Sequence, residues 1–146
     1  MLNIQFPRPD FQIRTQDGRE MIFDRWRKKW LLLTPEEWVR QNFVQFLINT
    51  QQYPPTLIAL EKQIRLGERL KRFDVLVYNP DHQPWMLVEC KAPTVALSAE
   101  SLQQVLRYHI SLPASFLVLT NGQQTLGWQK QEGKLLLLET MPAFPY

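Results

Sequence analysis

The sequence predicts one α/β domain in which helices pack against a mixed β-sheet. Short apolar runs bounded by turn residues are the mark of strands, and two segments carry helical spacing between them. The chain has 146 residues, of which 45% are hydrophobic. That length suffices for one well-packed core and is short for two. We therefore expect a single domain over residues 1–146, with helices covering the sheet.

The N-terminal part predicts a hairpin followed by a helix. Two apolar runs within residues 11–23 flank Asp17-Gly18, a pair typical of a tight hairpin turn. Thr34 is the expected N-cap of the helix, with Pro35 at its first position. Glu37 lies three residues after Thr34 and completes a capping box. This helix should extend to about Thr50, before the Tyr53-Pro-Pro55 break.

The remaining elements alternate strands with one more helix. Ser98 is the expected cap of a second helix that runs to about Ile110. The C-terminal tail, residues 141–146, should be irregular. The predicted strands cover residues 57–66, 72–78, 85–91, 115–120, 125–130 and 134–139.

Two of these strands place acidic residues opposite one another. If residues 79–84 form the loop of an antiparallel hairpin, Tyr78 pairs with Trp85 and Asp74 pairs with Glu89. Opposed side chains share a face, with Cβ atoms about 5 Å apart. Lys91 follows Glu89 by two residues and shares that face. Two neighbouring carboxylates repel each other unless a cation lies between them, so this arrangement indicates a metal site.

The reverse face of the hairpin supports the same register. A slip of one residue would turn Asp74 and Lys91 into the core. Cys90 should point to the core as an inert thiol. The side chains expected on this apolar, core-facing side are Phe73, Val75, Val77, Met86, Val88 and Cys90.

Carboxylates with a nearby lysine suit metal-assisted cleavage of phosphodiester bonds. Mg²⁺ takes oxygen ligands and keeps several waters, so Asp74, Glu89 and a strand carbonyl such as that of Cys90 would be enough. Lys91 could hold the attacking water or stabilise the developing charge. The simpler interpretation is that Glu89 and Lys91 are edge residues of an ordinary sheet.

Several segments, in this order, resemble the PD-(D/E)XK nuclease superfamily, and more narrowly the N-terminal domain of type I restriction enzyme R subunits in a small stand-alone form. The resemblance implies a restriction-endonuclease-like core of order α-β-β-β-α-β, with an N-terminal hairpin and extra C-terminal strands. The segments that carry it are Thr34-Pro-Glu-Glu-Trp-Val-Arg-Gln41, Arg72-Phe-Asp-Val-Leu-Val-Tyr78, Leu87-Val-Glu-Cys-Lys-Ala-Pro93, Gln104-Val-Leu-Arg-Tyr108 and Leu119-Thr-Asn-Gly122.

The resemblance also implies roles for single residues. Asp74 and Glu89 match the acidic metal ligands, and Lys91 matches the lysine that activates the attacking water. An acidic residue of the first helix often joins the site, and Glu37 is our choice, with Glu36 as its rival. Gln104 and Tyr108 match a Gln-x-x-x-Tyr element, and the resemblance alone predicts that they belong to the site.

The function implied is a Mg²⁺- or Mn²⁺-dependent endonuclease that hydrolyses DNA. R subunits carry a helicase motor after this domain, and residues 1–146 contain no Gly-rich phosphate loop that would bind ATP. The alternative is a non-catalytic nucleic-acid-binding or protein-interaction module that keeps the nuclease fold. A homodimer is plausible because double-strand cleavage needs two sites, and modification or specificity subunits are further candidate partners.

Basic residues lie in two stretches and one helix. The net charge is +3, which is compatible with nucleic-acid binding and does not establish it. Residues 25–30 hold four cations and two tryptophans that could contact phosphates and stack on bases. Alternatively this stretch is solvated and its tryptophans pack into the core. The predicted nucleic-acid contacts are Arg27, Lys28, Lys71, Arg72 and Arg107.

Other classes of site receive no support. A single cysteine excludes an internal disulfide and a cysteine-based zinc site. His82 and His109 have no partner at ligand spacing. No signal peptide and no apolar run of about 20 residues is visible, so we expect a cytoplasmic protein without a membrane span.

Overall fold

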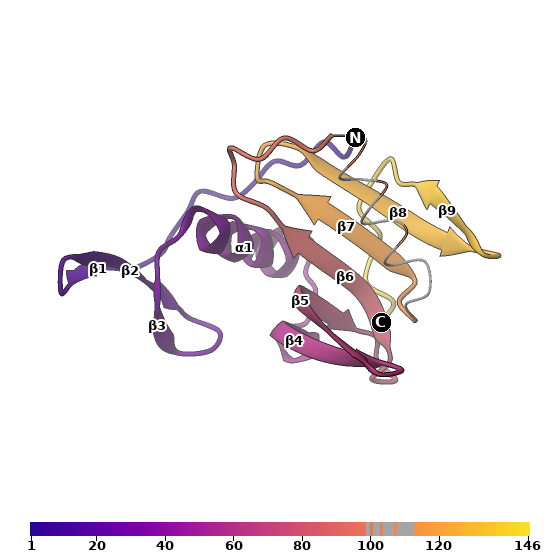
Figure 1. Ribbon diagram of the computed structural model, residues 1–146, viewed down its shortest axis with the longest axis horizontal. Coiled ribbons are helices and arrows are strands. Elements are labelled where there is room, and N and C mark those ends of the chain that lie inside the picture. Colours follow the sequence, from indigo (N-terminus) through magenta and orange to yellow (C-terminus); the bar gives the residue numbers. More distant parts are fainter. Residues whose placement is uncertain (99, 101–102, 104–106, 108–112) are drawn as a thin grey trace.

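The computed structural model describes residues 1–98, 100, 103, 107 and 113–146, and these form two β-sheets with a helix between them (Figure 1). The smaller sheet has the order β1 (Ile13–Gln16), β2 (Arg19–Asp24), β3 (Lys29–Leu32). The larger sheet has the order β4 (Ile58–Leu66), β5 (Arg69–Tyr78), β6 (Pro84–Cys90), β7 (Phe116–Thr120), β8 (Thr125–Gln131), β9 (Lys134–Leu137).

The larger sheet is mixed, as predicted. Every neighbouring pair is antiparallel except β6 and β7, which are parallel. A parallel pair needs a crossover connection, and the second predicted helix falls in that connection. Of this helix the structure describes Glu100, Gln103 and Arg107, which have helical backbone and exposed side chains. Within the predicted range 98–110, residues 99, 101–102, 104–106 and 108–110 lie outside the described residues.

The N-terminal hairpin forms where it was predicted. Asp17 and Gly18 both have positive φ, 52° and 76°, as a tight turn between twisted strands requires. The third strand of this sheet was not predicted. We interpreted residues 25–30 only as a basic stretch, but β3 begins at Lys29 and its Trp30 packs edge-to-face on Phe23. Cross-strand contacts therefore outweigh the local charge density there.

The first helix begins as predicted. The α1 helix (Pro35–Gln45) has Thr34 as its N-cap, and the Thr34 hydroxyl oxygen accepts a hydrogen bond from the Glu37 backbone N–H at 3.0 Å. The helix continues as a π-helical turn, η1 (Phe46–Thr50), which ends at the predicted residue. A short 3₁₀ turn, η2 (Pro55–Leu57), then leads into β4. Together these segments place α1 across β5 and β6.

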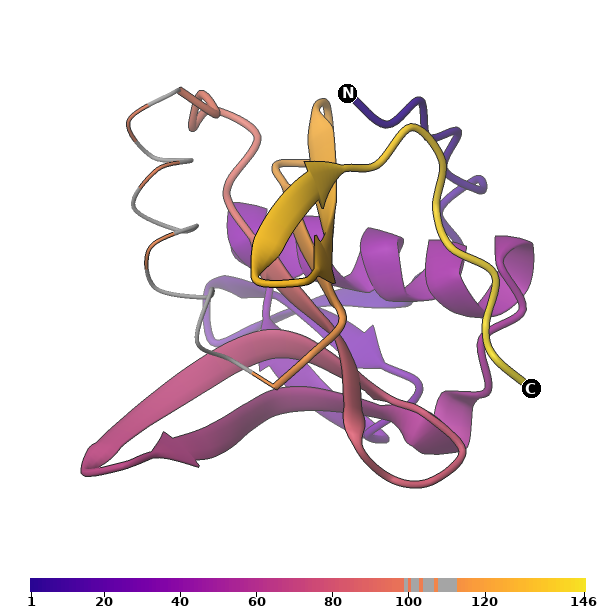
Figure 2. The ribbon, with the colours of Figure 1, turned by 90° about the vertical axis from the view of Figure 1, so that its right-hand side faces the viewer.

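The large sheet has an apolar core on each face. The α1 helix covers one face, as Figure 2 shows. The C-terminal tail lacks regular structure, as predicted, yet it closes this core because Phe144 is buried and the Tyr53 hydroxyl donates to the Pro142 carbonyl at 2.6 Å. The second core includes Phe73, Leu76, Leu87, Leu117, Leu119 and Trp128. No helix in the described part of the chain is long and apolar enough to cross a membrane.

Candidate functional site

The β5–β6 hairpin has the predicted register over its central pairs, which are Val75 with Val88, Leu76 with Leu87 and Val77 with Met86. Continued by one step, this register sets Asp74 across from Glu89. The prediction was wrong at the loop end: the register shifts after Val77, so that Tyr78 pairs with Pro84 and not with Trp85. The shift lies away from the acidic pair and leaves its alignment intact.

The apolar face of this hairpin changes sides at Asp74. Val75, Val77, Met86, Val88 and Cys90 all lie in the α1-side core, as predicted. Phe73 does not, and our prediction for it was wrong: it lies in the opposite core. In a regular strand, residues two apart share a face, but Phe73 and Val75 contribute to different cores, so β5 departs from regular alternation at the residue between them. Asp74 is that residue.

Asp74 is held by the backbone of the neighbouring strand. Its Oδ2 accepts a hydrogen bond from the Cys90 N–H at 2.8 Å. Burial raises the pKa of Asp74, the Cys90 hydrogen bond lowers it, and the charge of Glu89 raises it again; the net direction is upward. Arg40 and Lys91 act in the opposite direction. Asp74 is therefore a partly buried ionisable group whose pKa responds to the cations Arg40 and Lys91 and to the carboxylate of Glu89.

Glu89 is buried, with 8% of its surface exposed. The Lys71 ammonium lies 3.3 Å from its Oε1, so Lys71 pairs with the predicted metal ligand and is not a free cation. Lys91 lies just past the end of β6, half-buried, and its backbone N–H donates to the Thr120 carbonyl at 2.8 Å. This bond extends the parallel pairing by one residue and fixes the backbone that carries the Lys91 side chain.

Glu36 and Glu37 differ sharply in their environment. Glu36 is exposed, whereas Glu37 is 9% exposed and accepts hydrogen bonds from Arg40 and from the Gln41 amide. Glu37 is therefore the acidic residue of α1 that faces the sheet. Sequence alone left the two open, because adjacent residues on a helix differ by only about 100° in direction.

We expect Glu37→Gln to lower the free energy of unfolding by about 2 kcal/mol, because the buried Arg40 loses its closest counter-charge. Glu36→Gln is the matched control, with an expected change within about 0.5 kcal/mol for an exposed side chain. Urea denaturation measures both. Equal stability of the two variants would show that Glu37 has no buried role.

A charge network next to the acidic pair was not predicted. The Glu61 carboxylate on β4 forms ion pairs with three guanidinium groups. Arg27 also binds Asp24, which is fully buried, with an Nε–Oδ2 distance of 2.6 Å. The Glu61 distances are 3.1 Å to Arg27 Nη1, 3.3 Å to Arg40 Nη1 and 2.7 Å to Arg72 Nη2. Only the Glu37–Arg40 spacing of three residues on one helix could have signalled part of it.

The other predicted site residues fall into three groups. Cys90 is buried in the α1-side core, and burial raises the pKa of its thiol well above the usual range. Lys28 and Arg107 are exposed, as nucleic-acid contacts would need to be, whereas Arg27 and Arg72 are held by Glu61. Gln104 and Tyr108 lie outside the described residues.

The donor set for a metal is small. Among the described residues, no group of three His, Cys, Asp or Glu side chains is placed to hold a metal ion. Asp74 and Glu89 therefore offer two carboxylates, with further positions left to main-chain oxygens or water. This fits Mg²⁺, which is usually bound by one or two carboxylates and retains several waters.

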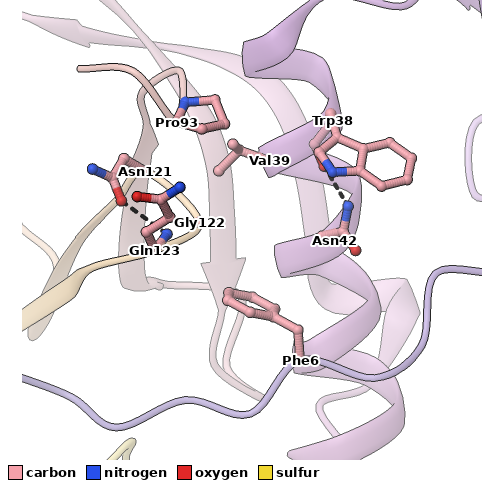
Figure 3. A pocket seen from close by; sticks show the side chains of 8 residues that line it. All are labelled: Phe6, Trp38, Val39, Asn42, Pro93, Asn121, Gly122 and Gln123. Carbon is pink, nitrogen blue, oxygen red and sulfur yellow. Dashed lines mark hydrogen bonds between the residues drawn. The ribbon is translucent and has the colours of Figure 1, made fainter. Parts of the chain in front are cut away.

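A pocket of about 270 Å³ lies beyond the carboxyl ends of β6 and β7 (Figure 3). Such a crevice is where ligands bind in many sheets with parallel strands. Phe6, Trp38 and Val39 form its apolar side, and the Asn121-Gly122-Gln123 turn closes it. The turn is fixed because Asn121 Oδ1 accepts from the N–H groups of Gln123 and Gln124 at 2.9 and 2.7 Å.

This fold, a mixed sheet with a helix on one face and a carboxylate pair at a β-hairpin, is that of a restriction-endonuclease-like α/β protein. Residues 35–145 match the family described as Type I restriction enzyme R protein N terminus (HSDR_N). The chain belongs to this family, as its motifs predicted.

One solved structure supports the fold. A fragment provisionally assigned as an HsdR subunit of a type I restriction enzyme from Vibrio vulnificus YJ016 has 21% sequence identity and a TM-score of 0.52, over 76% of this chain. This chain spans 24% of that protein. A protein provisionally assigned as a DUF820 nuclease, from Anabaena variabilis ATCC 29413, has 12% identity and a TM-score of 0.49, over 85% of this chain and 74% of its own. No curated protein matches the chain.

Proposed function

We propose that the chain is a Mg²⁺- or Mn²⁺-dependent endonuclease domain that hydrolyses DNA phosphodiester bonds. The observation that carries the proposal is the β5–β6 register, which sets Asp74 across from the buried Glu89, next to Lys91. A sheet gains nothing in stability from two opposed carboxylates. Their presence, in a member of a restriction-enzyme family, supports a role in chemistry.

Asp74 and Glu89 would hold the metal, and a bound metal supplies a polarised phosphate and a water of lowered pKa. The chain's own residues prepare the site. The Cys90 N–H fixes one Asp74 oxygen, which leaves the other available as a ligand. Lys71 neutralises Glu89 before any metal binds, so it would have to yield as the cation arrives. Lys91 would orient the attacking water and stabilise charge on the phosphorane.

A second function is favoured by the ion pairing in the free chain. Glu89 is already neutralised by Lys71 at 3.3 Å, and one oxygen of Asp74 is already hydrogen-bonded. A non-catalytic nucleic-acid-binding or protein-interaction module could use the same stable arrangement. The partners proposed under either function are DNA, a second copy of the chain, and modification or specificity subunits.

Nicking of a supercoiled plasmid separates the two functions. With Mg²⁺ or Mn²⁺ we expect wild-type protein to nick, and Asp74→Asn, Glu89→Gln and Lys91→Ala each to reduce the rate at least about a hundredfold. Lys62→Ala, on an exposed β4 position, is the control for loss of a positive charge and should keep the rate. Residual activity shared equally by all variants would identify a contaminant and remove the site assignment.

Metal binding provides a separate measurement. If Asp74 and Glu89 hold the metal, Mn²⁺ should raise the melting temperature of wild-type protein and leave that of Glu89→Gln unchanged. DNA binding without nicking or any Mn²⁺ response would favour the non-catalytic module.

A further inference from the structure

We propose that Arg27, Arg40 and Arg72 form a binding site for a nucleic-acid phosphate beside Asp74, and that the Glu61 carboxylate occupies this site in the free chain. The inference rests on the proposed function in taking nucleic acid as the ligand. In this proposal, a phosphate of the nucleic-acid backbone displaces the Glu61 carboxylate from the three arginines.

The place of Glu61 puts the site next to the acidic pair. Leu60 pairs with Val75 and Lys62 pairs with Phe73, so Glu61 lies across from Asp74 on the neighbouring strand. A phosphate held here would lie within about one nucleotide of a phosphate bound at Asp74 and Glu89, because strands are about 4.8 Å apart.

Two of the guanidinium groups contain buried N–H donors that make no hydrogen bond among the described residues. Arg40 is 3% exposed, and its Nη1 makes no hydrogen bond among the described residues, although it lies in ion-pair range of Glu61. Arg27 Nη2 is likewise buried without a hydrogen bond. Buried donors without acceptors are rare, since each loses its hydration. A phosphate offers more acceptor oxygens than a carboxylate, and guanidinium groups bind it bidentately.

The charge balance suits the exchange. Without Glu61, the three arginines face the two carboxylates of Asp24 and Glu37, so one net positive charge remains. A phosphodiester carries one negative charge and would restore neutrality, as Glu61 does now. Arg72 is the entry side, with 60% of its side chain exposed, while Arg40 forms the buried floor.

The position of Glu61 would also allow its carboxylate to move away from the arginines. It lies on β4, an edge strand of the large sheet, with 35% of its side chain exposed. Its φ of 54° is in the left-handed region, which is uncommon for a residue within a strand and costs about 1 kcal/mol or more. Rotation of the carboxylate toward solvent would open the arginine cluster without moving the core.

The test measures binding of a short fluorescein-labelled DNA duplex in EDTA, so that cleavage does not enter. We expect Glu61→Gln to bind about fivefold more tightly than wild type, because the competing charge is gone. Glu68→Gln is the matched control, since Glu68 is exposed at the turn of the same hairpin. If the two variants bind equally well, the site does not exist.

A second pair of variants covers the case in which Glu61→Gln fails to fold. Arg72→Gln should weaken DNA binding more than Arg69→Gln does, and this comparison does not need Glu61→Gln. Where Glu61→Gln folds, adding Arg72→Gln should also abolish its gain in binding. Arg69 is exposed on the same strand and makes the control for diffuse charge. Equal losses from Arg72→Gln and Arg69→Gln would overturn the inference.

Inorganic phosphate separates this inference from the nuclease proposal. Phosphate should raise the melting temperature of Glu61→Gln above that in sodium chloride of equal ionic strength, and Glu61→Gln/Arg72→Gln should lose that difference. No phosphate effect in Glu61→Gln, with plasmid nicking intact, would remove the phosphate site alone. A phosphate effect without nicking by the wild type would keep the phosphate site and remove the nuclease.

Discussion

Asp74→Asn is expected to abolish plasmid nicking and at the same time to stabilise the protein in the absence of metal. Asparagine keeps an oxygen to accept the Cys90 N–H bond, but it removes a charge that burial and Glu89 disfavour. We expect the melting temperature to rise by about 2–4 °C, the shift that about 1 kcal/mol gives a domain of this size. Stability gained as function is lost is typical of residues kept for chemistry.

The stabilisation should depend on pH in one direction. The pKa of Asp74 is raised in the folded chain, so the folded state takes up its proton more readily than the unfolded state does. Wild-type protein therefore recovers stability as pH falls through the folded pKa, and the advantage of Asp74→Asn should shrink there. Thermal melts across this range measure the effect. An advantage that grows on acidification would contradict a raised pKa for Asp74.

The same shift predicts how nicking depends on pH. Metal binding requires the ionised carboxylate, so activity should fall as pH drops through the raised pKa of Asp74. Glu68→Gln, which changes an exposed carboxylate, should leave the profile in place.

Arg40→Gln is expected to destabilise the protein by about 3 kcal/mol, because breaking a buried ion pair leaves an uncompensated charge. Arg40 is 3% exposed and pairs with Glu37 and Glu61 at once. Without it, the partners that Glu37 keeps among the described residues are the Gln41 amide at 2.9 Å and Arg27 Nη2 at 4.0 Å. Urea denaturation measures the loss, and Arg69→Gln should change stability by less than about 0.5 kcal/mol.

A second variant separates loss of charge balance from loss of packing. Glu37→Gln combined with Arg40→Gln removes both members of the pair, so part of the stability should return. If the double variant is as unstable as the sum of the single ones, the two side chains are not coupled. Removing Arg40 should also raise the pKa of Asp74 further, because Arg40 lowers it now, and move the nicking profile to higher pH.

Local sequence patterns were enough for much of the fold. Thr34 and Pro35 marked the start of α1, because capping depends on residues within one turn of the helix. Asp17-Gly18 marked the first hairpin in the same way. The Glu37 carboxylate, expected to complete a capping box, instead accepts from Arg40 and Gln41. The apolar alternation of residues 75–77 and 86–88 aligned β5 with β6, since a slip would have exposed one face and buried charges in the other.

Patterns failed where partners come from distant segments. Strand β3 was missed because it has few strand signals of its own and forms against β2. Phe73 was assigned to the wrong core because strand alternation assumes a regular twist, and the chain changes sides at Asp74. The C-terminal tail was correctly expected to lack regular structure, but nothing local showed that Phe144 would pack against Tyr53 and Trp85.

The opposed carboxylates of Asp74 and Glu89 could thus be deduced from the sequence itself, because the apolar period of two residues sets the register of the central strand pairs. The turn residues did not set it, since the pairing at the loop end differs from the prediction. The family could be deduced as well, because its motifs are short and lie in order along the chain. Only the tertiary structure decided which charges surround this pair. Arg27, Arg40, Glu61 and Arg72 come from four separate segments, the β2–β3 turn, α1, β4 and β5. The choice of their partners depends on how α1 and the small sheet pack against β4 and β5.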